Sequence, residues 1–97
     1  MHYVYVLKSK IDSWLYIGCT DDLRKRFAEH NSGKTKSIKH RIPFELIYYE
    51  AYRSKRDARK RELELKKNSY QKEQLVKIIE NYFNIYKWRH RLAWSRT

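Results

Sequence analysis

Two short segments near the start of the chain constrain the fold more than any other feature of the sequence. Residues 2–8 read "HYVYVLK" and residues 14–20 read "WLYIGCT". Both are rich in aromatic and β-branched side chains, which favour strands. The connection between them, "SKIDS", is short enough for a hairpin loop. The sequence therefore predicts an antiparallel hairpin at the beginning of the fold.

The two faces of this hairpin follow from the period of two along each strand. If Lys8 pairs with Ser13, Tyr5 lies opposite Tyr16. One face then carries Tyr3, Tyr5, Leu7, Trp14 and Tyr16. The other face carries Val4, Val6, Leu15 and Ile17. A slip of one residue would move one strand's set to the wrong face, so the register decides which tyrosines share a site.

A helix is predicted directly after the hairpin, over "LRKRFAEHN". Thr20 or Asp21 can cap its N-terminus, where side-chain oxygens satisfy free backbone N–H groups. Its inward stripe consists of Leu23, Phe27 and His30. A basic loop of turn-forming residues, "GKTKSIKHRIP", follows.

The second half of the chain predicts one more strand and two helices. Residues 44–52, "FELIYYEAY", alternate like a strand. Ser54 followed by Asp57 matches a variant of the capping box and begins a second helix. A third helix runs from about Tyr70, with an apolar stripe of Leu75, Ile78, Ile79 and Tyr82. The order β-β-α-β-α-α predicts an α+β fold, a small three-stranded antiparallel sheet flanked by helices.

The composition sets the size of the unit and the kind of partner. The 97 residues, 41% of them hydrophobic, suit one domain, which we place at residues 1–84, with a basic aromatic tail at residues 85–97. The net charge of +12 favours nucleic acid as partner, before an anionic membrane. The single cysteine, Cys19, excludes a disulfide framework and a thiolate zinc site. No apolar run reaches the roughly 20 residues of a membrane span, so we expect a cytoplasmic protein.

An acidic residue lies on the apolar face of the second helix. In "DARKRELELKK", Ala58, Glu62 and Leu65 share one side of the helix. A buried, unpaired carboxylate costs several kcal/mol, so Glu62 requires a partner. One kind of partner is a metal ion. The other is a cationic side chain, for which the candidates are Arg26, Arg59 and Arg61.

Five side chains have the chemistry to cleave a phosphodiester: Tyr5, Tyr16, Arg26, His30 and Glu62. A carboxylate can hold one hard cation such as Mg²⁺, and a guanidinium can offset charge that grows on the phosphate. A tyrosine can orient or deprotonate the attacking water if a cation stabilises its phenolate. Each residue also has a structural interpretation. Arg26 can be a solvated charge, His30 a hydrogen-bonded helix-end residue, and the tyrosines half-buried rings with wet hydroxyls.

The order of motifs resembles a known nuclease family. "YVY" at residues 3–5 and "YIG" at residues 16–18 are similar to the two signature tripeptides of the GIY-YIG nuclease domain. The likeness continues through "LRKRFAEHN", "KTKSIKHRIPFELIYYEAY" and "ARKRELELK", and is strongest to small stand-alone bacterial members. Tyr3 replaces the glycine of the first tripeptide. The resemblance implies the family fold, a small antiparallel sheet flanked by helices.

The resemblance also implies roles for individual residues. The signature tyrosines match Tyr5 and Tyr16, the catalytic arginine matches Arg26, and the nearby histidine matches His30. The glutamate that holds the single divalent metal, Mg²⁺ or Mn²⁺, matches Glu62. Gly18 is expected to be structural, either because a side chain would obstruct a close approach or because the backbone needs unusual angles. Many members carry an asparagine beyond the glutamate helix; Asn68 is the nearest candidate, with a helix C-terminal role as the alternative.

These observations lead to one expected function and one rival. We expect a Mg²⁺-dependent endonuclease acting on DNA as a monomer or weak dimer, with the basic loop contacting phosphates through Lys34, Lys36, Lys39, His40 and Arg41. The same loop can instead be a solvated surface. The rival is a DNA- or RNA-binding module that keeps the fold without turnover, because charge alone gives affinity.

Overall fold

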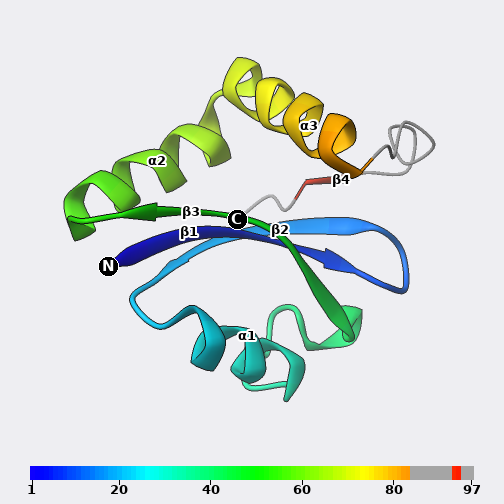
Figure 1. Ribbon diagram of the computed structural model, residues 1–97. Helices are drawn as coiled ribbons and strands as arrows, with labels where there is room; N and C mark the ends of the chain where they lie inside the picture. The colour runs from blue at the N-terminus through cyan, green and yellow to red at the C-terminus, as the bar shows by residue number, and fades with distance from the viewer. Residues whose placement is uncertain (84–92, 95–97) are drawn as a thin grey trace.

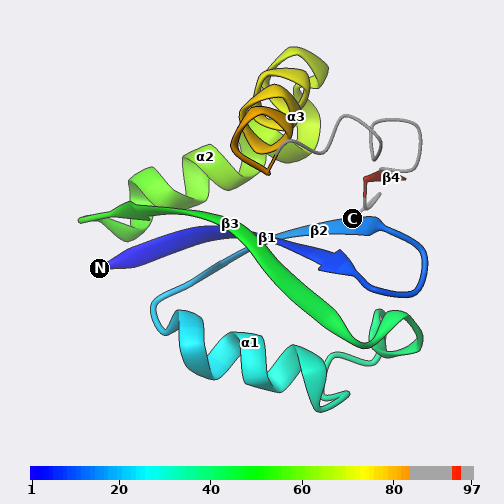
Figure 2. The same ribbon diagram turned by 45° about the vertical axis from the view of Figure 1, so that its right-hand side comes forward.

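The computed structural model describes residues 1–83 and 93–94 of the chain. Figure 1 shows a sheet between two helical layers, with α1 on one face and α2 and α3 on the other. Figure 2 shows the same layering after a rotation of 45°. The three antiparallel strands and three α-helices follow the order β-β-α-β-α-α, which confirms the predicted α+β class.

The sheet has the strand order β3-β1-β2-β4. β1 covers His2–Ser9, β2 covers Trp14–Thr20 and β3 covers Phe44–Tyr52, and these three are antiparallel as predicted. β4, Ala93–Trp94, adds two residues parallel to the beginning of β2. The predicted boundary after residue 84 and the rest of the tail lie outside the described residues.

The register of the hairpin differs from the prediction by two residues, because Tyr5 lies opposite Gly18 rather than Tyr16. The connection runs over residues 10–13, because Ser9, expected in the loop, belongs to β1. The Ser13 N–H donates to the Ser9 carbonyl at 3.0 Å, and Ser13 has a positive φ of 61°. A shift of two keeps every side chain on its face, so the predicted faces of both strands are confirmed.

Each face of the sheet has its own core. The face under α2 and α3 buries Val4, Val6, Leu15, Ile17, Ile47, Ala58, Leu65, Leu75 and Ile79. The face over α1 buries Tyr5, Leu7, Ile38 and Phe44. Ile38 belongs to the basic loop, just before the short 3-10 helix η1, Lys39–Arg41. This loop is therefore anchored in the core and is not purely a solvated segment.

Helix α1 covers Leu23–Asn31, and its N-cap is Asp22 rather than the predicted Thr20 or Asp21. The Asp22 carboxylate accepts a hydrogen bond from the Lys25 N–H at 3.1 Å, which is the usual N-cap geometry. The Thr20 hydroxyl instead accepts from the Asp22 N–H at 3.1 Å. The cap lies one or two residues later than predicted because Thr20 ends β2 and bonds the turn, not the helix.

Helices α2 and α3 cover Lys55–Lys67 and Ser69–Phe83. The predicted cap of α2 is confirmed, since the Ser54 hydroxyl accepts from the Asp57 N–H at 3.0 Å. The predicted buried stripe of α2 is also confirmed: Ala58, Glu62 and Leu65.

The stripe predicted for α3 is partly wrong. Ile78 is 48% exposed, and Val76 is buried in its place. The helix is rotated about its axis toward Val76, a placement set by the elements packed against it rather than by the apolar pattern alone. The side chain of Tyr82 lies outside the described part of the structure.

Candidate active site

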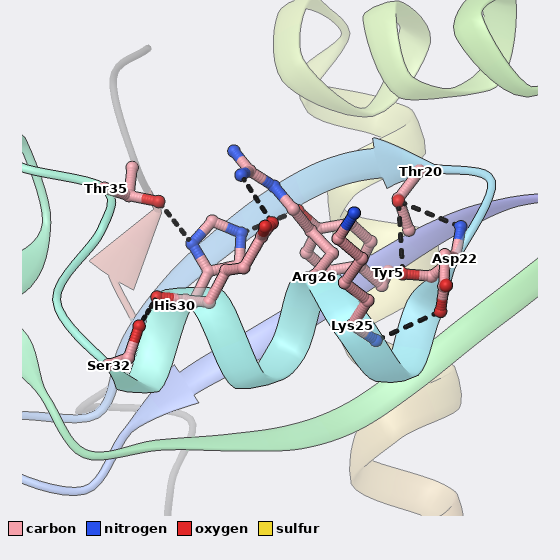
Figure 3. Close-up of polar contacts among 9 residues, drawn as sticks. Tyr5, Thr20, Asp22, Lys25, Arg26, His30, Ser32 and Thr35 are labelled. Atoms are coloured by element: carbon pink, nitrogen blue, oxygen red, sulfur yellow. Dashed lines mark hydrogen bonds and ion pairs between the residues drawn. The ribbon is translucent and has the colours of Figure 1, made fainter.

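A chain of hydrogen bonds runs through the core on the α1 face of the sheet. The Tyr5 hydroxyl and His30 Nε2 are 2.8 Å apart, and His30 Nδ1 is 3.0 Å from the Thr35 hydroxyl (Figure 3). Tyr5 is 2% exposed and His30 is completely buried. The ring of Tyr16 packs edge-on against His30 with centroids 5.2 Å apart. The two signature tyrosines and the histidine thus lie together, on one face, as the sequence predicted.

Burial keeps both members of the central hydrogen bond neutral. Burial and then the positive charge of Arg26 lower the pKa of His30 to about 4. Burial and then Tyr16 raise the pKa of the Tyr5 phenol, against the hydrogen bond and charge of Arg26. A neutral imidazole donates from one ring nitrogen and accepts at the other. His30 therefore bridges Tyr5 to the basic loop as an uncharged connector at pH 7.

Gly18 is required because Tyr5 crosses over it. The two residues are directly opposite in the β1–β2 ladder. A Cβ built on Gly18 would overlap the hydroxyl and Cζ of the Tyr5 side chain, which is held in the core. Of the two reasons that the sequence left open, close approach is the one that applies, since the left-handed φ among the described glycines belongs to Gly33.

Arg26 brings a positive charge from α1 to the edge of this network. It forms an ion pair with Glu29 at 3.3 Å, and 37% of its side chain is exposed. A hydrogen bond with the Tyr5 hydroxyl opposes the rise of that phenol's pKa. The guanidinium lines a hollow of about 440 Å³ whose other residues are Thr20, Asp21, Asp22, Lys25 and Glu29. Arg26 is thus bonded to the core on one side and open to a ligand on the other.

Glu62 approaches the sheet from the opposite layer. It is 5% exposed on α2, where its carboxylate accepts from Arg59 and Lys66, each at 3.0 Å. Burial and then the Glu62 charge raise the pKa of the Cys19 thiol, so the acid lies near the end of β2. Its charge also helps to raise the pKa of Tyr5.

The open edge of β2 makes this arrangement accessible. Within the described residues, β4 covers β2 only at Trp14 and Leu15. A hollow of about 290 Å³ lies beside the uncovered end of β2, lined by His2, Cys19, Thr20, Asp21, Lys55 and Arg59. This hollow and the one at Arg26 share Thr20 and Asp21. The two sides of the candidate site therefore flank the turn from β2 into α1.

The chemistry of Glu62 is suited to one hard cation and no more. In the described part of the chain, no three acidic, histidine or cysteine side chains converge on a metal position. Mg²⁺ is commonly held by one or two carboxylates together with waters and substrate phosphates. The charge of the Glu62 carboxylate is already met by two cationic side chains, so a divalent ion would have to take the place of one of them. Glu62 therefore fits such an ion, in competition with Arg59 and Lys66.

Comparison with known proteins agrees with this geometry. The family model described as the GIY-YIG catalytic domain matches residues 1–74. The chain belongs to the GIY-YIG family. The matched residues include β1, β2, α1, β3 and α2, the elements that carry the candidate site.

Small proteins with the same domain are similar over nearly their whole length. A UPF0213 protein of Staphylococcus haemolyticus is 44% identical over 80 residues, which cover 81% of this chain and 94% of that protein. A UPF0213 protein of Streptococcus pyogenes is 43% identical over 77 residues, covering 78% and 83%. The solution structure of the UPF0213 protein BH0048 from Bacillus halodurans aligns with a TM-score of 0.54 at 40% identity, covering 91% of this chain and 96% of that one. None of the helices described here is long and apolar enough to cross a membrane.

The basic loop of this GIY-YIG domain divides into two parts. Lys34, Lys36, Lys39 and His40 are exposed. Arg41 differs, because its guanidinium pairs with Asp12 and stacks 4.3 Å above the ring of Trp14. The four exposed side chains are free to contact a polyanion. Arg41 holds the loop against the hairpin.

Asn68 has a structural role in α2. It is the C-cap, and its N–H donates to the Glu64 carbonyl at 2.9 Å. Its side-chain oxygen accepts from the Gln71 N–H at 3.1 Å. These bonds join the end of α2 to the beginning of α3, in agreement with the helix C-terminal alternative.

A second polar network was missed by the sequence analysis. Glu50 accepts two hydrogen bonds from Arg61 and one each from the hydroxyls of Tyr48 and Tyr52. Arg61 also donates to Gln71 of α3. The strand pattern contained this information, because Tyr48, Glu50 and Tyr52 are two residues apart and therefore lie on one face of β3. An acid between two tyrosines on a core-facing strip needs a cation, and α2 supplies it.

Proposed function

We propose that this chain is a metal-dependent endonuclease that hydrolyses phosphodiester bonds in DNA. The observation that carries the proposal is the position of Arg26. Its side chain lies close enough to the buried Tyr5 hydroxyl to oppose the rise of that phenol's pKa, and it lines an open hollow beside Lys25. This happens within a domain that belongs to a nuclease family. A fixed cation beside an open hollow suits a phosphate in the course of reaction.

Arg26 would stabilise the charge that develops on the phosphate. Its ion pair with Glu29 at 3.3 Å restrains the guanidinium, so less reorganisation is needed when a phosphate enters. A guanidinium can bond two phosphate oxygens at once, which a lysine cannot do. Lys25 lines the same hollow and would add charge without that geometry.

Glu62 would hold Mg²⁺ or Mn²⁺ at the other side of the β2 edge. Such an ion, when bound, polarises the phosphoryl oxygen and lowers the pKa of an associated water. Arg59 is the partner of Glu62 that can yield its place, since 58% of its side chain is exposed. A phosphate brought to the hollow would itself attract the displaced guanidinium.

The two signature tyrosines would have different roles toward the attacking water. Tyr5 keeps its proton, because burial and the Tyr16 ring raise its pKa and its hydroxyl bonds His30. Tyr16 is half-buried on the same face and is the phenol that we assign to orienting or deprotonating the water. His30 is then a positioning residue for Tyr5 rather than a proton shuttle, since its ring is enclosed.

The exposed members of the basic loop would bind the flanking backbone. Four side chains of the loop that follows α1 are exposed and can contact a phosphate without first leaving the core: Lys34, Lys36, Lys39 and His40. Arg41 would contribute indirectly, by fixing the loop on Trp14. One such set of groups supports a single strand cut per encounter, by a monomer or weak dimer.

A nucleic-acid-binding module without turnover is the second candidate, and one observation favours it. The Glu62 carboxylate is already neutralised by Arg59 and Lys66, which is the ion-pair alternative that the sequence left open for this residue. Under this function, the acid stabilises α2, and the positive charge of the chain alone gives affinity.

A cleavage assay separates the two functions. Single-stranded, duplex and branched DNA are incubated with the protein in Mg²⁺, in Mn²⁺ and in chelator. We expect metal-dependent cleavage by the wild type and by Glu64→Ala, a matched acid on the same helix, and none by Glu62→Ala or Arg26→Ala. Binding in chelator should persist in all four proteins. Absence of cleavage in the wild type, or equal cleavage by Glu62→Ala, would leave the binding module.

A further inference from the structure

A third hollow, on the α1 face of the sheet, has a different lining from the two hollows at Arg26 and Arg59. It measures about 470 Å³ and is lined by Tyr3, Asp21, Asp22, Leu23, Arg24, Phe27, Leu46 and Tyr49. This volume lies within the roughly 300–1,000 Å³ of small-molecule sites. None of the five candidate catalytic residues lines it, and the basic loop does not contribute to it.

Aromatic rings form the wall of this hollow. Tyr3 and Tyr49 meet edge to face with centroids 6.0 Å apart. Tyr49 is 55% exposed, and it lies directly opposite Tyr5 in the β1–β3 ladder. Burying such a ring in the core would be the ordinary solution for a strand residue. Here it presents an accessible flat surface beside the candidate active site.

The two hollows differ in how many cations they offer a phosphate. Asp21 and Asp22 line both, and each hollow has one acid more than it has cations. The hollow at Tyr3 and Tyr49 has the single cation Arg24, whereas the neighbouring hollow has Lys25 and Arg26. A backbone phosphate therefore finds two cationic partners on the Arg26 side and one on the tyrosine side. A neutral group with a flat face and N–H donors suits the tyrosine side, because carboxylates accept hydrogen bonds from such donors.

We infer that this hollow, between Tyr3, Tyr49 and the beginning of α1, binds one unpaired nucleobase next to the phosphate held at Arg26. The inference rests on the proposed function, since it takes the ligand to be nucleic acid. The two hollows share Asp21 and Asp22 at the beginning of α1; Leu23 and Arg24 line one of them, and Lys25 and Arg26 line the other. Figure 3 shows this first turn, with Asp22, Lys25 and Arg26 labelled. Base and phosphate of one strand would thus straddle this turn, and a base still paired in a duplex could not enter.

The test measures binding in chelator, so that cleavage plays no part. A 2-aminopurine base is placed in a single-stranded oligonucleotide, made once as DNA and once as RNA, and compared with a blunt duplex of the same length. Tyr49→Ala should weaken single-strand binding by roughly 5- to 100-fold, the range for loss of one base–aromatic stack. Duplex binding should change by less than about twofold, and 2-aminopurine quenching should fall.

Two variants keep the result interpretable. Tyr49→Phe retains the ring and should bind the single strand like the wild type. Tyr70→Ala removes a tyrosine that is 67% exposed on α3, away from the hollow, and should change nothing. Equal binding by Tyr49→Ala, or an equal loss on duplex and single strand, would overturn the inference. Weaker binding of the single strand by Tyr49→Ala, whether the strand is DNA, RNA or either, supports the inference and shows which nucleic acid supplies the base.

The outcome is independent of the cleavage assay. If the wild type does not cleave but Tyr49 dependence is found, the hydrolase proposal fails and the base site stands. If metal-dependent cleavage is found without Tyr49 dependence, the base site fails and the hydrolase proposal stands.

Discussion

Glu50 and Glu62 are both carboxylates paired with arginines of α2, yet their surroundings differ. Glu50 accepts four hydrogen bonds, two from the fixed fork of Arg61 and two from tyrosine hydroxyls. Glu62 is more deeply buried, and its partners among the described residues are Arg59 and Lys66, of which Arg59 is mostly exposed. A carboxylate has about four acceptor positions. The Glu50 region is therefore saturated, and the Glu62 region is not.

The difference indicates which acid serves the fold and which is available to a ligand. Saturated buried networks rigidify a fold and have no capacity left for a partner. The Glu50 network joins β3, α2 and α3 through Arg61 and Gln71, so it fixes the helix that carries Glu62. An acid with exchangeable partners on a fixed helix is suited to a cation.

Replacing Glu62 should give the largest effect, on activity rather than stability. Glu62→Gln should slow metal-dependent cleavage about a thousandfold, because a bound ion supplies several kcal/mol and each 1.4 kcal/mol is tenfold. The free energy of unfolding, from urea titration, should change by less than about 1 kcal/mol, because the partners can turn to solvent. A large loss of stability would place Glu62 with Glu50 as a structural acid.

Replacing Arg61 should have the converse effect. Arg61→Ala leaves Glu50 half-buried without its cation and should lower the free energy of unfolding by about 3 kcal/mol. Arg59→Ala on the same helix is the matched control and should cost at most about 1 kcal/mol. Equal losses in the two variants, measured by urea denaturation, would remove the distinction between the regions.

The loss of stability at low pH should report on the ionisation of Glu50. Although burial opposes its ionisation, bonds from Arg61, Tyr48 and Tyr52 lower the pKa of Glu50 below its ordinary value of 4.5. The stability from a lowered carboxyl pKa is complete above the unfolded value and is lost as the pH falls through the folded one. Stability of the wild type should therefore decline more steeply below pH 4.5 than that of Glu50→Gln. Parallel pH profiles would contradict the assignment.

The smallest expected effect concerns competition at Glu62. Arg59→Ala removes one of the two cations that occupy the carboxylate. The Mg²⁺ concentration for half-maximal cleavage, at saturating DNA, should fall by roughly two- to fivefold, the worth of an exposed ion pair. An unchanged or raised metal requirement would mean that Arg59 does not compete with the ion.

Local patterns predicted much of the fold and part of the site. The α+β order, the hairpin faces, the Ser54 cap and the burial of Glu62 all follow from periodicity or from a cap within a few residues. The gathering of Tyr5, Tyr16 and His30 on one face follows from the same rules. These features were predictable because strand and helix geometry act over short sequence distances.

Contacts between distant segments were decided only by the tertiary structure. The hairpin register depended on the geometry of the loop around Ser13, which strand periodicity does not define. The Glu50–Arg61 pair joins a strand to a helix, and the third hollow brings Tyr49 of β3 to the beginning of α1. Periodicity determines which face a residue occupies, but packing in three dimensions determines what it meets there.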